Sequence, residues 1–421
     1  MNADSLVDTV VLGEDSYALI SPNKISFLSG ANRDEVAQRI KAEKLHLTML
    51  NITPTFDKEI ESITFLPTLN CNLRCIYCYA KGGEQQTNLT EDLAKIALDD
   101  LASKTTGTVQ IDFAGGGEPF FNFKVMDYIL KYAKKLFREV HVRLVTNGTF
   151  NKDHLQWILD NDIDLRISFD GLAHRYQRPF KTGMSSSEAV ENNLKELVKL
   201  NKKFKVQCIV TEESANYIID TIQHLSKLGV KLIKIEPVHI SEISRKSNQL
   251  KPPTPQQFVD KFIEALEYIM RNKLDMKLDT AFLSRPTTGY YCGLRHNIII
   301  TPEGNITGCV EFTRKIDPFS ELIVNGKCSL GEKKLLFNER AKAELKRLHM
   351  DNYKACHSCN LKLICKSGCP ARNLFDKGNT FMQSPYTCAI EKNLIPRVLH
   401  LISKNSAYSN IVFDKFKIDE C

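Results

Sequence analysis

Cys71-Asn72-Leu73-Arg74-Cys75-Ile76-Tyr77-Cys78 is the stretch around which the rest of the chain is arranged. It comes directly after an apolar run, Ile63 to Leu69, which has the length and composition of a buried strand. Three cysteines at C-x3-C-x2-C spacing therefore lie on a short loop at the C-terminal end of that strand. Three thiolates on one loop suit three corners of a cuboidal iron–sulfur cluster. A [4Fe–4S] cluster has four irons, so one iron is left open to a small molecule.

Zinc binding and disulfide formation are the two other uses of such a loop. Structural zinc sites favour four ligands, and no fourth cysteine or histidine stands near these three. A disulfide would leave one thiol over and needs an oxidising compartment. The spacing, the strand before the loop and the aromatic Tyr77 before the third cysteine favour the open iron–sulfur site.

The loop resembles that of the radical S-adenosylmethionine (SAM) superfamily. The resemblance implies that Cys71, Cys75 and Cys78 hold a [4Fe–4S] cluster whose open iron chelates the amino and carboxylate groups of SAM. One electron from the cluster then cleaves SAM to methionine and a 5′-deoxyadenosyl radical. In that family the residue matching Tyr77 packs near the adenine.

Strand-like and helix-like segments alternate six times after residue 60. Regular βα repetition predicts parallel strands with right-handed crossovers. Six units are too few for a closed eight-stranded barrel, so we expect an α/β fold with a partial, open (β/α)6 TIM-like barrel, as in the family. The predicted strands are Ile63–Leu69, Val109–Phe113, Val140–Val145, Leu165–Phe169, Phe204–Val210 and Val230–Ile235. The predicted helices are Glu91–Ala102, Phe123–Phe137, Lys152–Leu159, Ser187–Leu200, Asn216–Leu228 and Pro255–Arg271.

Polar and glycine-rich motifs follow these strands, at the end where barrel folds collect their sites. The second strand ends in three glycines, Glu118 and Pro119, and glycine lets the backbone approach a ligand closely, although a simple turn uses glycine too. The family has a Gly-Gly-Glu-Pro motif here. The resemblance implies that Gly116, Gly117, Glu118 and Pro119 bind the methionyl amine of SAM.

Later strand ends match further family positions. Asn147 resembles a residue that faces the nucleoside, and Ser168 resembles one that contacts the ribose or carboxylate of SAM. Asp170, two residues after Ser168, is grouped with it as cofactor-binding. Arg178 resembles a basic residue that pairs with a carboxylate, with a surface arginine as the alternative. The backbone of residues 236–238 would flank the adenine.

A second group of seven cysteines lies beyond residue 285. Residues 298–307 predict a β-hairpin with a Pro-Glu-Gly-Asn turn, which would hold Cys292 and Cys309 close together. Zinc ribbons produce two C-x2-C pairs but not this order of seven. The set resembles the SPASM domain, an extension of radical SAM enzymes with two auxiliary [4Fe–4S] clusters. The resemblance implies two ligand sets: Cys292, Cys309 and Cys369 for the first cluster, and Cys356, Cys359, Cys365 and Cys388 for the second.

Two positions depart from the sulfatase-maturating members of the family. Those members have a further cysteine where this chain has Pro286, and a catalytic aspartate where it has Val310. Glu311, one residue further, is the candidate catalytic residue. Cys328 is an alternative fourth ligand for the first auxiliary cluster. Of the other cysteines, Cys208 is expected as a small buried hydrophobe and Cys421 as a mobile terminal thiol.

Composition places the chain among soluble globular proteins. It has 421 residues, 43% hydrophobic and 25% charged, and a formal net charge of +7. The sequence contains neither a signal peptide nor a long apolar run, so we expect neither secretion nor membrane insertion. No interleaved basic and aromatic stripe indicates nucleic-acid binding. Thirteen cysteines in a chain without a signal peptide indicate metal-binding thiolates and not disulfides, so we expect the protein in a reducing cytoplasm.

We expect four parts: a small N-terminal α+β unit (1–60), a radical SAM core (61–285), the SPASM domain (286–395) and a C-terminal tail (396–421). The first unit predicts three short strands and a helix from Arg33 to about Leu45. It is either an element that recognises a peptide leader or a lid on the core.

The resemblances together imply three [4Fe–4S] clusters, SAM, and a flavodoxin- or ferredoxin-type reductant. The expected function is maturation of a ribosomal precursor peptide, with a thioether from a substrate cysteine as the first hypothesis. The alternatives are carbon–carbon crosslinking, formylglycine formation as in sulfatase maturation, and alcohol dehydrogenation. A non-catalytic iron–sulfur electron carrier is the alternative from another class, although it would need no SAM pocket.

Overall fold

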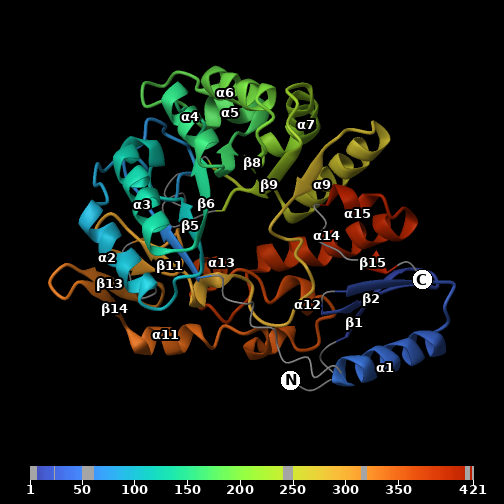
Figure 1. Cartoon of the computed structure of the whole chain (residues 1–421). Coiled ribbons are helices and arrows are strands. Elements are labelled where there is room, and N and C mark those ends of the chain that lie inside the picture. The colour runs from blue at the N-terminus through green and yellow to red at the C-terminus, as the bar shows by residue number, and fades with distance from the viewer. Residues whose placement is uncertain are drawn as a thin grey trace.

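An eleven-stranded sheet forms the centre of the molecule. The computed structural model describes residues 7–22, 24–49, 61–239, 250–313, 320–412 and 418–419. The strand order of the large sheet is β10-β9-β8-β7-β6-β5-β4-β11-β12-β13-β14, and its first seven strands run parallel. The connecting helices cover the outside of this curved sheet (Figure 1). The predicted open α/β barrel is confirmed.

All six predicted strands are present, and a short seventh follows them. The strands are β4 (Glu61–Phe65), β5 (Thr108–Phe113), β6 (Glu139–Thr146), β7 (Asp164–Ser168), β8 (Phe204–Val210), β9 (Leu232–Pro237) and β10 (Lys277–Asp279). The helices are α2 (Glu91–Ala102), α3 (Phe123–Leu136), α4 (Lys152–Asp160), α5 (His174–Gln177), α6 (Ser187–Lys199), α7 (Ile218–Lys227) and α9 (Pro255–Arg271). The first predicted strand was four residues too long, because the chain leaves the sheet after Phe65 although its apolar run continues to Leu69. The three residues of β10 are too few to show a pattern.

Alternating burial along the strands separates a core face from a polar face. In β8, Phe204, Val206, Cys208 and Val210 are buried in the hydrophobic core, and the residues between them are only half-buried. The prediction of Cys208 as a buried hydrophobe is confirmed. A polar concave face leaves the strand ends free to carry a ligand site.

The cysteine-rich C-terminal segment extends the same sheet. β11 (Ile298–Ile300) pairs in parallel with β4, and β12 (Asn305–Thr307) returns as the predicted hairpin. Two more antiparallel strands follow, β13 (Gly326–Ser329) and β14 (Lys334–Phe337). The remaining helices are α10 (Ser320–Ile323), α11 (Glu339–Leu345), α12 (Lys362–Cys365), α13 (Pro370–Lys377), α14 (Pro385–Lys404) and α15 (Tyr408–Ile411). Because β11 joins the edge of β4, the two cysteine-bearing regions share one continuous scaffold.

The N-terminal unit packs against this C-terminal segment. β1 (Asp8–Gly13), β2 (Ser16–Ser21) and β3 (Lys24–Ser29) form a sheet with β15 (Ile418–Asp419), and α1 (Arg33–Met49) follows β3. β1 contacts α14, Thr9 O accepts a hydrogen bond of 2.9 Å from Asn360 Nδ2, and Asp8 Oδ2 accepts one of 3.3 Å from Leu363 N. Burial raises the pKa of Asp8 to about 6. Residue 395, the expected end of the SPASM domain, lies inside α14.

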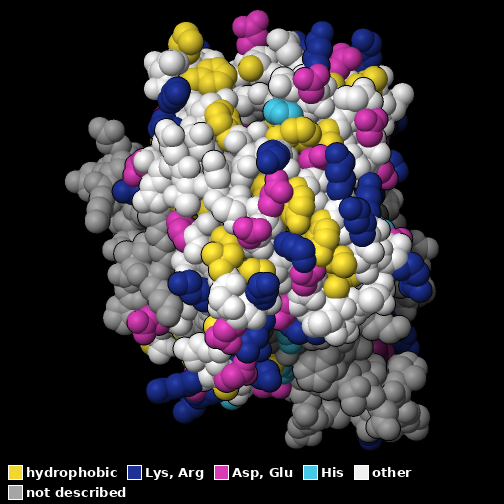
Figure 2. Space-filling view, turned by 60° about the vertical axis from the view of Figure 1, so that its left-hand side comes forward, with side chains coloured by type: hydrophobic (Ala, Val, Ile, Leu, Met, Phe, Trp, Pro, Cys, Tyr) yellow, Lys and Arg dark blue, Asp and Glu magenta, His cyan; other side chains and the backbone are white. Residues whose placement is uncertain are grey.

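Surface charge is mixed on the face that Figure 2 shows, where Lys and Arg side chains lie among Asp and Glu. In the described part of the chain, no helix is long and apolar enough to cross a membrane. Cys421 lies outside the described residues.

α14 joins the N-terminal sheet to the barrel, so its apolar face should matter for stability. Leu399 is fully buried in the core that includes residues of both. Leu399→Ala should lower the free energy of unfolding by about 2–5 kcal/mol, since a cavity replaces the side chain. Lys404→Ala, an exposed change on the same helix, should stay near the wild type in urea denaturation. Equal midpoints for the two variants would contradict this role of α14.

Candidate active site

Arg74, inside the cysteine loop, holds that loop together. Its Nη1 donates hydrogen bonds to the carbonyl oxygens of Cys71 (3.0 Å), Leu73 (2.8 Å) and Gly82 (3.3 Å). Its Nη2 donates to Gly83 O at 2.9 Å. Backbone carbonyls in an irregular loop need donors when they are buried, and one guanidinium supplies four of these bonds. The sequence analysis attached no role to this arginine.

A second segment of backbone runs beside the cysteine loop. Pro179 O accepts a hydrogen bond from Arg74 N at 2.8 Å, and Gln177 O accepts one from Ile76 N at 3.0 Å. In the opposite sense, Lys181 N donates to the loop, at Asn72 O (2.8 Å). The loop therefore has a strand-like partner in residues 177–181, which directly contain Arg178.

The glycine-rich motif after β5 supports the other side of the loop. Gly117 N donates to Thr68 O, and Glu118 N donates to Asn70 O, both at 2.8 Å. A Cβ atom on Gly117 would lie 2.0 Å from Asn70 O, so only glycine allows this approach. Gly116 and Gly117 also line the cavity described below, whereas Pro119 begins the short helix η2 (Pro119–Asn122) and does not line it.

Nitrogen donors surround the three sulfur atoms of the loop. Burial raises the pKa of Cys71 to about 11 and that of Cys75 to about 12. Metal binding must therefore drive their deprotonation, as it does for thiol ligands in general. The donors are Leu73 N to Cys71 Sγ (3.4 Å), Gly82 N to Cys78 Sγ (3.3 Å), Arg178 Nη1 to Cys75 Sγ (4.0 Å) and Asn147 Nδ2 to Cys71 Sγ (3.9 Å).

In the described part of the chain, no three His, Cys, Asp or Glu side chains converge on a single metal position. A cuboidal cluster does not need such convergence, because each thiolate binds a different iron.

Glu118 joins the ends of two neighbouring strands. Its buried carboxylate accepts hydrogen bonds from Thr146 Oγ1 and Asn147 N, both at 2.7 Å. Burial raises the pKa of Glu118 to about 7. The side chain of Asn147 in turn donates to Asn72 Oδ1 at 2.8 Å. Glu118 therefore positions Asn147 against the cysteine loop and also lines the cavity.

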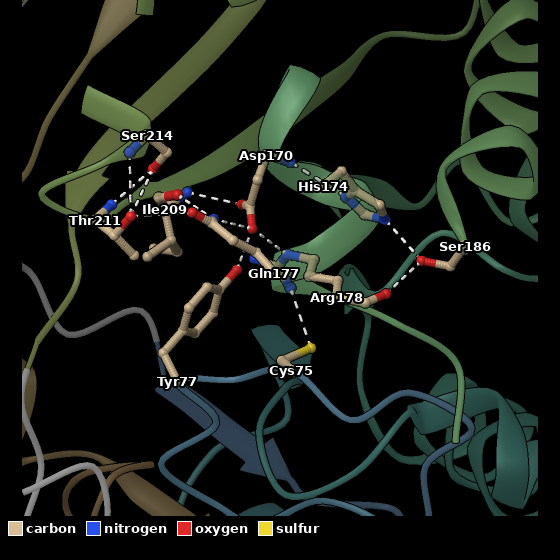
Figure 3. Close-up of polar contacts among 10 residues, drawn as sticks. All are labelled: Cys75, Tyr77, Asp170, His174, Gln177, Arg178, Ser186, Ile209, Thr211 and Ser214. Carbon is tan, nitrogen blue, oxygen red and sulfur yellow. Dashed lines mark hydrogen bonds and ion pairs between the residues drawn. The ribbon is translucent and has the colours of Figure 1, made fainter. Parts of the chain in front are cut away.

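Asp170 is the centre of a group of hydrogen bonds (Figure 3) and is not among the residues that line the cavity. Its carboxylate accepts hydrogen bonds from Tyr77 Oη, Gln177 Nε2 (2.8 Å), Arg178 Nε (2.9 Å) and Ile209 N (2.9 Å). Burial alone would raise the pKa of Asp170, but the Arg178 charge and these donors hold it below its usual range. Because four donors occupy the carboxylate, we assign Asp170 to positioning Tyr77 and Arg178 instead of contacting SAM itself.

Arg178 is a buried residue and not the surface arginine of the alternative. Its guanidinium lies 5.2 Å from the centroid of the Tyr77 ring, a cation–π distance. Its carbonyl oxygen accepts a hydrogen bond of 2.6 Å from Ser186 Oγ, which lies 2.9 Å from His174 Nε2. Figure 3 shows this series of hydrogen bonds, which runs from His174 of α5 through Ser186 and Arg178 to Cys75 of the cysteine loop.

A cavity of about 360 Å³ lies between the cysteine loop and the strand ends. Of the predicted cofactor-binding residues, the cavity is lined by Tyr77, Gly116, Gly117, Glu118, Asn147, Ser168 and Arg178, with residues 236–238 and the candidate Glu311. It is also lined by Lys234, His239, Ala281 and Arg372, to which the sequence analysis gave no role.

The carboxyl group of Glu311 has a lowered pKa. Burial alone would raise the pKa of Glu311, but His239 and Arg372 more than offset this and hold it below its usual range.

The C-terminal cysteines form two groups. Cys292, Cys309 and Cys369 lie close enough to perturb one another electrostatically. Cys356, Cys359, Cys365 and Cys388 line a second cavity of about 260 Å³. The structure thus brings together the members of each of the two sets that the resemblance implied.

Cys328 belongs to neither group. It is buried in the hydrophobic core, and its Sγ lies 3.6 Å from Leu93 O of α2. Burial, and then the charge of Asp100, raise its pKa to about 11, with no contribution from another cysteine. The alternative in which Cys328 closes the first auxiliary cluster therefore does not agree with the structure.

Residues 65–225 match the model of the Radical SAM superfamily. The chain carries a radical SAM domain. The resemblance based on the cysteine loop is thereby confirmed, and with it SAM and one [4Fe–4S] cluster as the cofactors of the domain. An uncharacterized protein of Methanocaldococcus jannaschii is 31% identical over 173 residues, which are 40% of this chain and 59% of that protein. The chain spans about three fifths of the length of two relatives that it matches over this domain.

Other similarities extend into the C-terminal segment. A cysteine-type anaerobic sulfatase-maturating enzyme of Clostridium perfringens is 20% identical over 369 residues, covering 79% of this chain and 95% of the enzyme. The solved structure of anSMEcpe with bound AdoMet and the Cp18Cys peptide has a TM-score of 0.68 at 16% identity. The match covers 84% of this chain and 100% of that one. SuiB of Streptococcus suis, bound to precursor peptide SuiA, has a TM-score of 0.56 at 17% identity. The match covers 86% of this chain and 82% of that one. These structures share the fold of the radical SAM domain and its extension.

The cavity generates a test of SAM binding. Ser168→Ala and Glu118→Ala should each weaken SAM binding about tenfold to a hundredfold, because loss of a charge-assisted hydrogen bond costs roughly 1.5–3 kcal/mol. Iron content should stay at the wild-type value. Ser62→Ala, a change on β4 away from the cavity, should leave the affinity unchanged in equilibrium dialysis. Wild-type affinity in both cavity variants would place the SAM site elsewhere.

Proposed function

We propose that this chain is a radical SAM enzyme that matures a ribosomal precursor peptide by forming a crosslink, with a thioether from a substrate cysteine as the bond. The observation that carries the proposal is a single cavity that is lined both by the cysteine loop and by Glu311 and Arg372. Each of those two residues lies within three residues of a cysteine of the first auxiliary group.

The donor sets fit three [4Fe–4S] clusters. Cys71, Cys75 and Cys78 would hold the first, next to the SAM site. The two C-terminal groups would hold the auxiliary clusters, with three and four cysteines. When bound, the clusters and SAM supply the 5′-deoxyadenosyl radical that removes a hydrogen atom from the peptide, and an acceptor for the electron that remains. The chain's own residues hold the peptide carbon and sulfur close together, which favours their coupling through proximity.

The count of three cysteines in the first auxiliary group supports the thioether. Pro286 stands where related enzymes have a further cysteine, and Cys328 faces α2. A cluster held by these three cysteines would keep one coordination position for a soft ligand, and a substrate thiolate is such a ligand. This makes the peptide a Cys-containing one.

Formylglycine formation remains the second candidate, because sulfatase-maturating enzymes are among the relatives. Pro286 and Val310 depart from that pattern and count against it. Carbon–carbon crosslinking and alcohol dehydrogenation need no open auxiliary iron. A non-catalytic electron carrier would have no use for the SAM-sized cavity. The electron donor we expect is a flavodoxin or ferredoxin in a reducing cytoplasm, and the twelve described cysteines are all free thiols.

Iron content tests the cluster assignment. Anaerobically reconstituted protein should hold about twelve irons, four for each [4Fe–4S] cluster. Replacing Cys71, Cys75 and Cys78 with Ala should leave about eight irons and abolish conversion of SAM to 5′-deoxyadenosine. Cys208→Ala, a buried cysteine outside the three groups, should retain about twelve. Stoichiometric zinc without sulfide in the wild type would refute the assignment.

A co-expressed Cys-containing peptide tests the reaction. Mass spectrometry should show a loss of two hydrogens in the wild type and in Cys328→Ala, since Cys328 contacts α2 and not the auxiliary group. The same peptide should perturb the paramagnetic resonance spectrum of an auxiliary cluster, and its Cys→Ser version should not. Iron loss in Cys328→Ala, together with no spectral response to the peptide, would favour a closed cluster that only transfers electrons.

A further inference from the structure

His239 and Glu311 meet at the wall of the cavity. His239 follows β9 in the barrel, and Glu311 follows β12 in the C-terminal segment. His239 Nδ1 lies 3.2 Å from Glu311 Oε2, an ion-pair distance at which Oε2 forms no hydrogen bond with the described residues, and both side chains line the cavity. Residues from two distant parts of the chain thus form a dyad beside the place that the peptide would occupy.

The other ring nitrogen of this histidine has no hydrogen-bond partner in the part of the chain that the structure describes. His239 Nε2 is buried, and no atom in the described ranges of the chain forms a hydrogen bond with it. The ring is held by Phe375 at a centroid distance of 5.3 Å, and Phe375 stacks on Phe312 at 4.9 Å. With aromatic packing against the ring and a carboxylate beside Nδ1, Nε2 is the ring nitrogen left without a described partner. In catalytic histidines a carboxylate at one nitrogen orients the ring so that the other nitrogen accepts the proton.

We propose that His239 Nε2 is the base that accepts the proton released when the peptide is oxidised, and that Glu311 is a positioning residue that orients this histidine. The inference rests on the proposed function. Oxidation of the peptide by two electrons removes two hydrogens. One leaves as a hydrogen atom to the deoxyadenosyl radical. The other leaves as a proton, here to His239, and its electron passes to an oxidised auxiliary iron–sulfur cluster. For a thioether, this proton is the one on the substrate thiol, and the carbon–sulfur bond replaces one C–H and one S–H bond.

The neighbouring charged groups leave this role to the histidine. Lys234 Nζ lies 3.2 Å from Glu236 Oε1, which also accepts a hydrogen bond from Ala281 N at 2.5 Å. Arg372, on α13, lies over Phe282 at 5.3 Å and acts electrostatically on Glu311. The lysine therefore has its own carboxylate, and the arginine adds positive charge beside Glu311. Tyr79 and the thiols of Cys292, Cys309 and Cys369 are further titratable groups that interact electrostatically with Glu311. Glu311 is thereby reassigned from candidate catalytic residue to the partner of His239.

The kinetic test separates hydrogen abstraction from deprotonation. Reconstituted His239→Gln should still transfer deuterium from a labelled peptide to 5′-deoxyadenosine within about threefold of the wild-type rate. Crosslinked product should fall at least about a hundredfold, the usual contribution of a general base. Added imidazole should restore part of the product. Glu311→Gln should give a smaller loss that imidazole does not restore. His141→Gln, a change of an exposed histidine on β6, should behave as wild type.

Parallel loss of deuterium transfer and product in His239→Gln, without rescue by imidazole, would overturn the assignment. A second readout needs no cofactor. In ¹⁵N-histidine spectra of the full chain, assigned with His239→Gln, the wild type should show Nδ1 protonated and Nε2 free, and Glu311→Gln should lose this preference. A proton on Nε2 in the wild type would also overturn the dyad. A wild type that transfers no deuterium from any peptide would refute the proposed function alone, because the nitrogen spectra would still decide the dyad.

Discussion

The buried carboxylate of Asp170 is the interaction on which the geometry of the SAM site depends. It gathers donors from the cysteine loop, from α5, from the segment after α5 and from β8, and it has no exposed side-chain surface. Removing one partner of a buried ion pair costs about 3–5 kcal/mol, because the other charge remains without compensation. Tyr77 and Arg178 therefore keep their places only while Asp170 is present. A carboxylate that does not line the cavity thus still determines how the cavity is shaped.

Two further constraints act on the same loop, which contains no helix or strand. The guanidinium of Arg74 satisfies carbonyls along it, and the backbone of Gly117 lies too close to Asn70 O for any side chain to fit. An irregular loop with its backbone groups paired loses little entropy when it binds a cluster. The thiols, by contrast, have pKa values raised by burial, so the energy that binds the metal also deprotonates them.

Much of this arrangement could be predicted from the sequence because it is local. The order of strands, the glycine motif and the cysteine spacings each occupy a few consecutive residues, and parallel strands bring their ends together regardless of detail. The pairing of β11 with β4, the hub at Asp170 and the dyad of His239 with Glu311 are contacts between residues far apart in the chain. The hydrophobic periodicity of the sequence carries no information about such contacts. A single histidine after a strand carries no signal by itself, and Cys328 fits a ligand or a core position equally well until its neighbours are known.

The continuous sheet gives the proposed chemistry its physical basis. A radical at a peptide carbon must meet its partner atom before it reacts elsewhere, so the distance between the SAM site and the auxiliary group has to be constant. Two domains joined by a flexible linker would not hold that distance. Here β11 extends the barrel through backbone hydrogen bonds to β4, the strand that carries the cysteine loop, while the turn after β12 carries Cys309 and Glu311. The hydrogen bonds between β11 and β4 therefore set the separation between the SAM site, where the radical forms, and the first auxiliary group, where the new bond is completed.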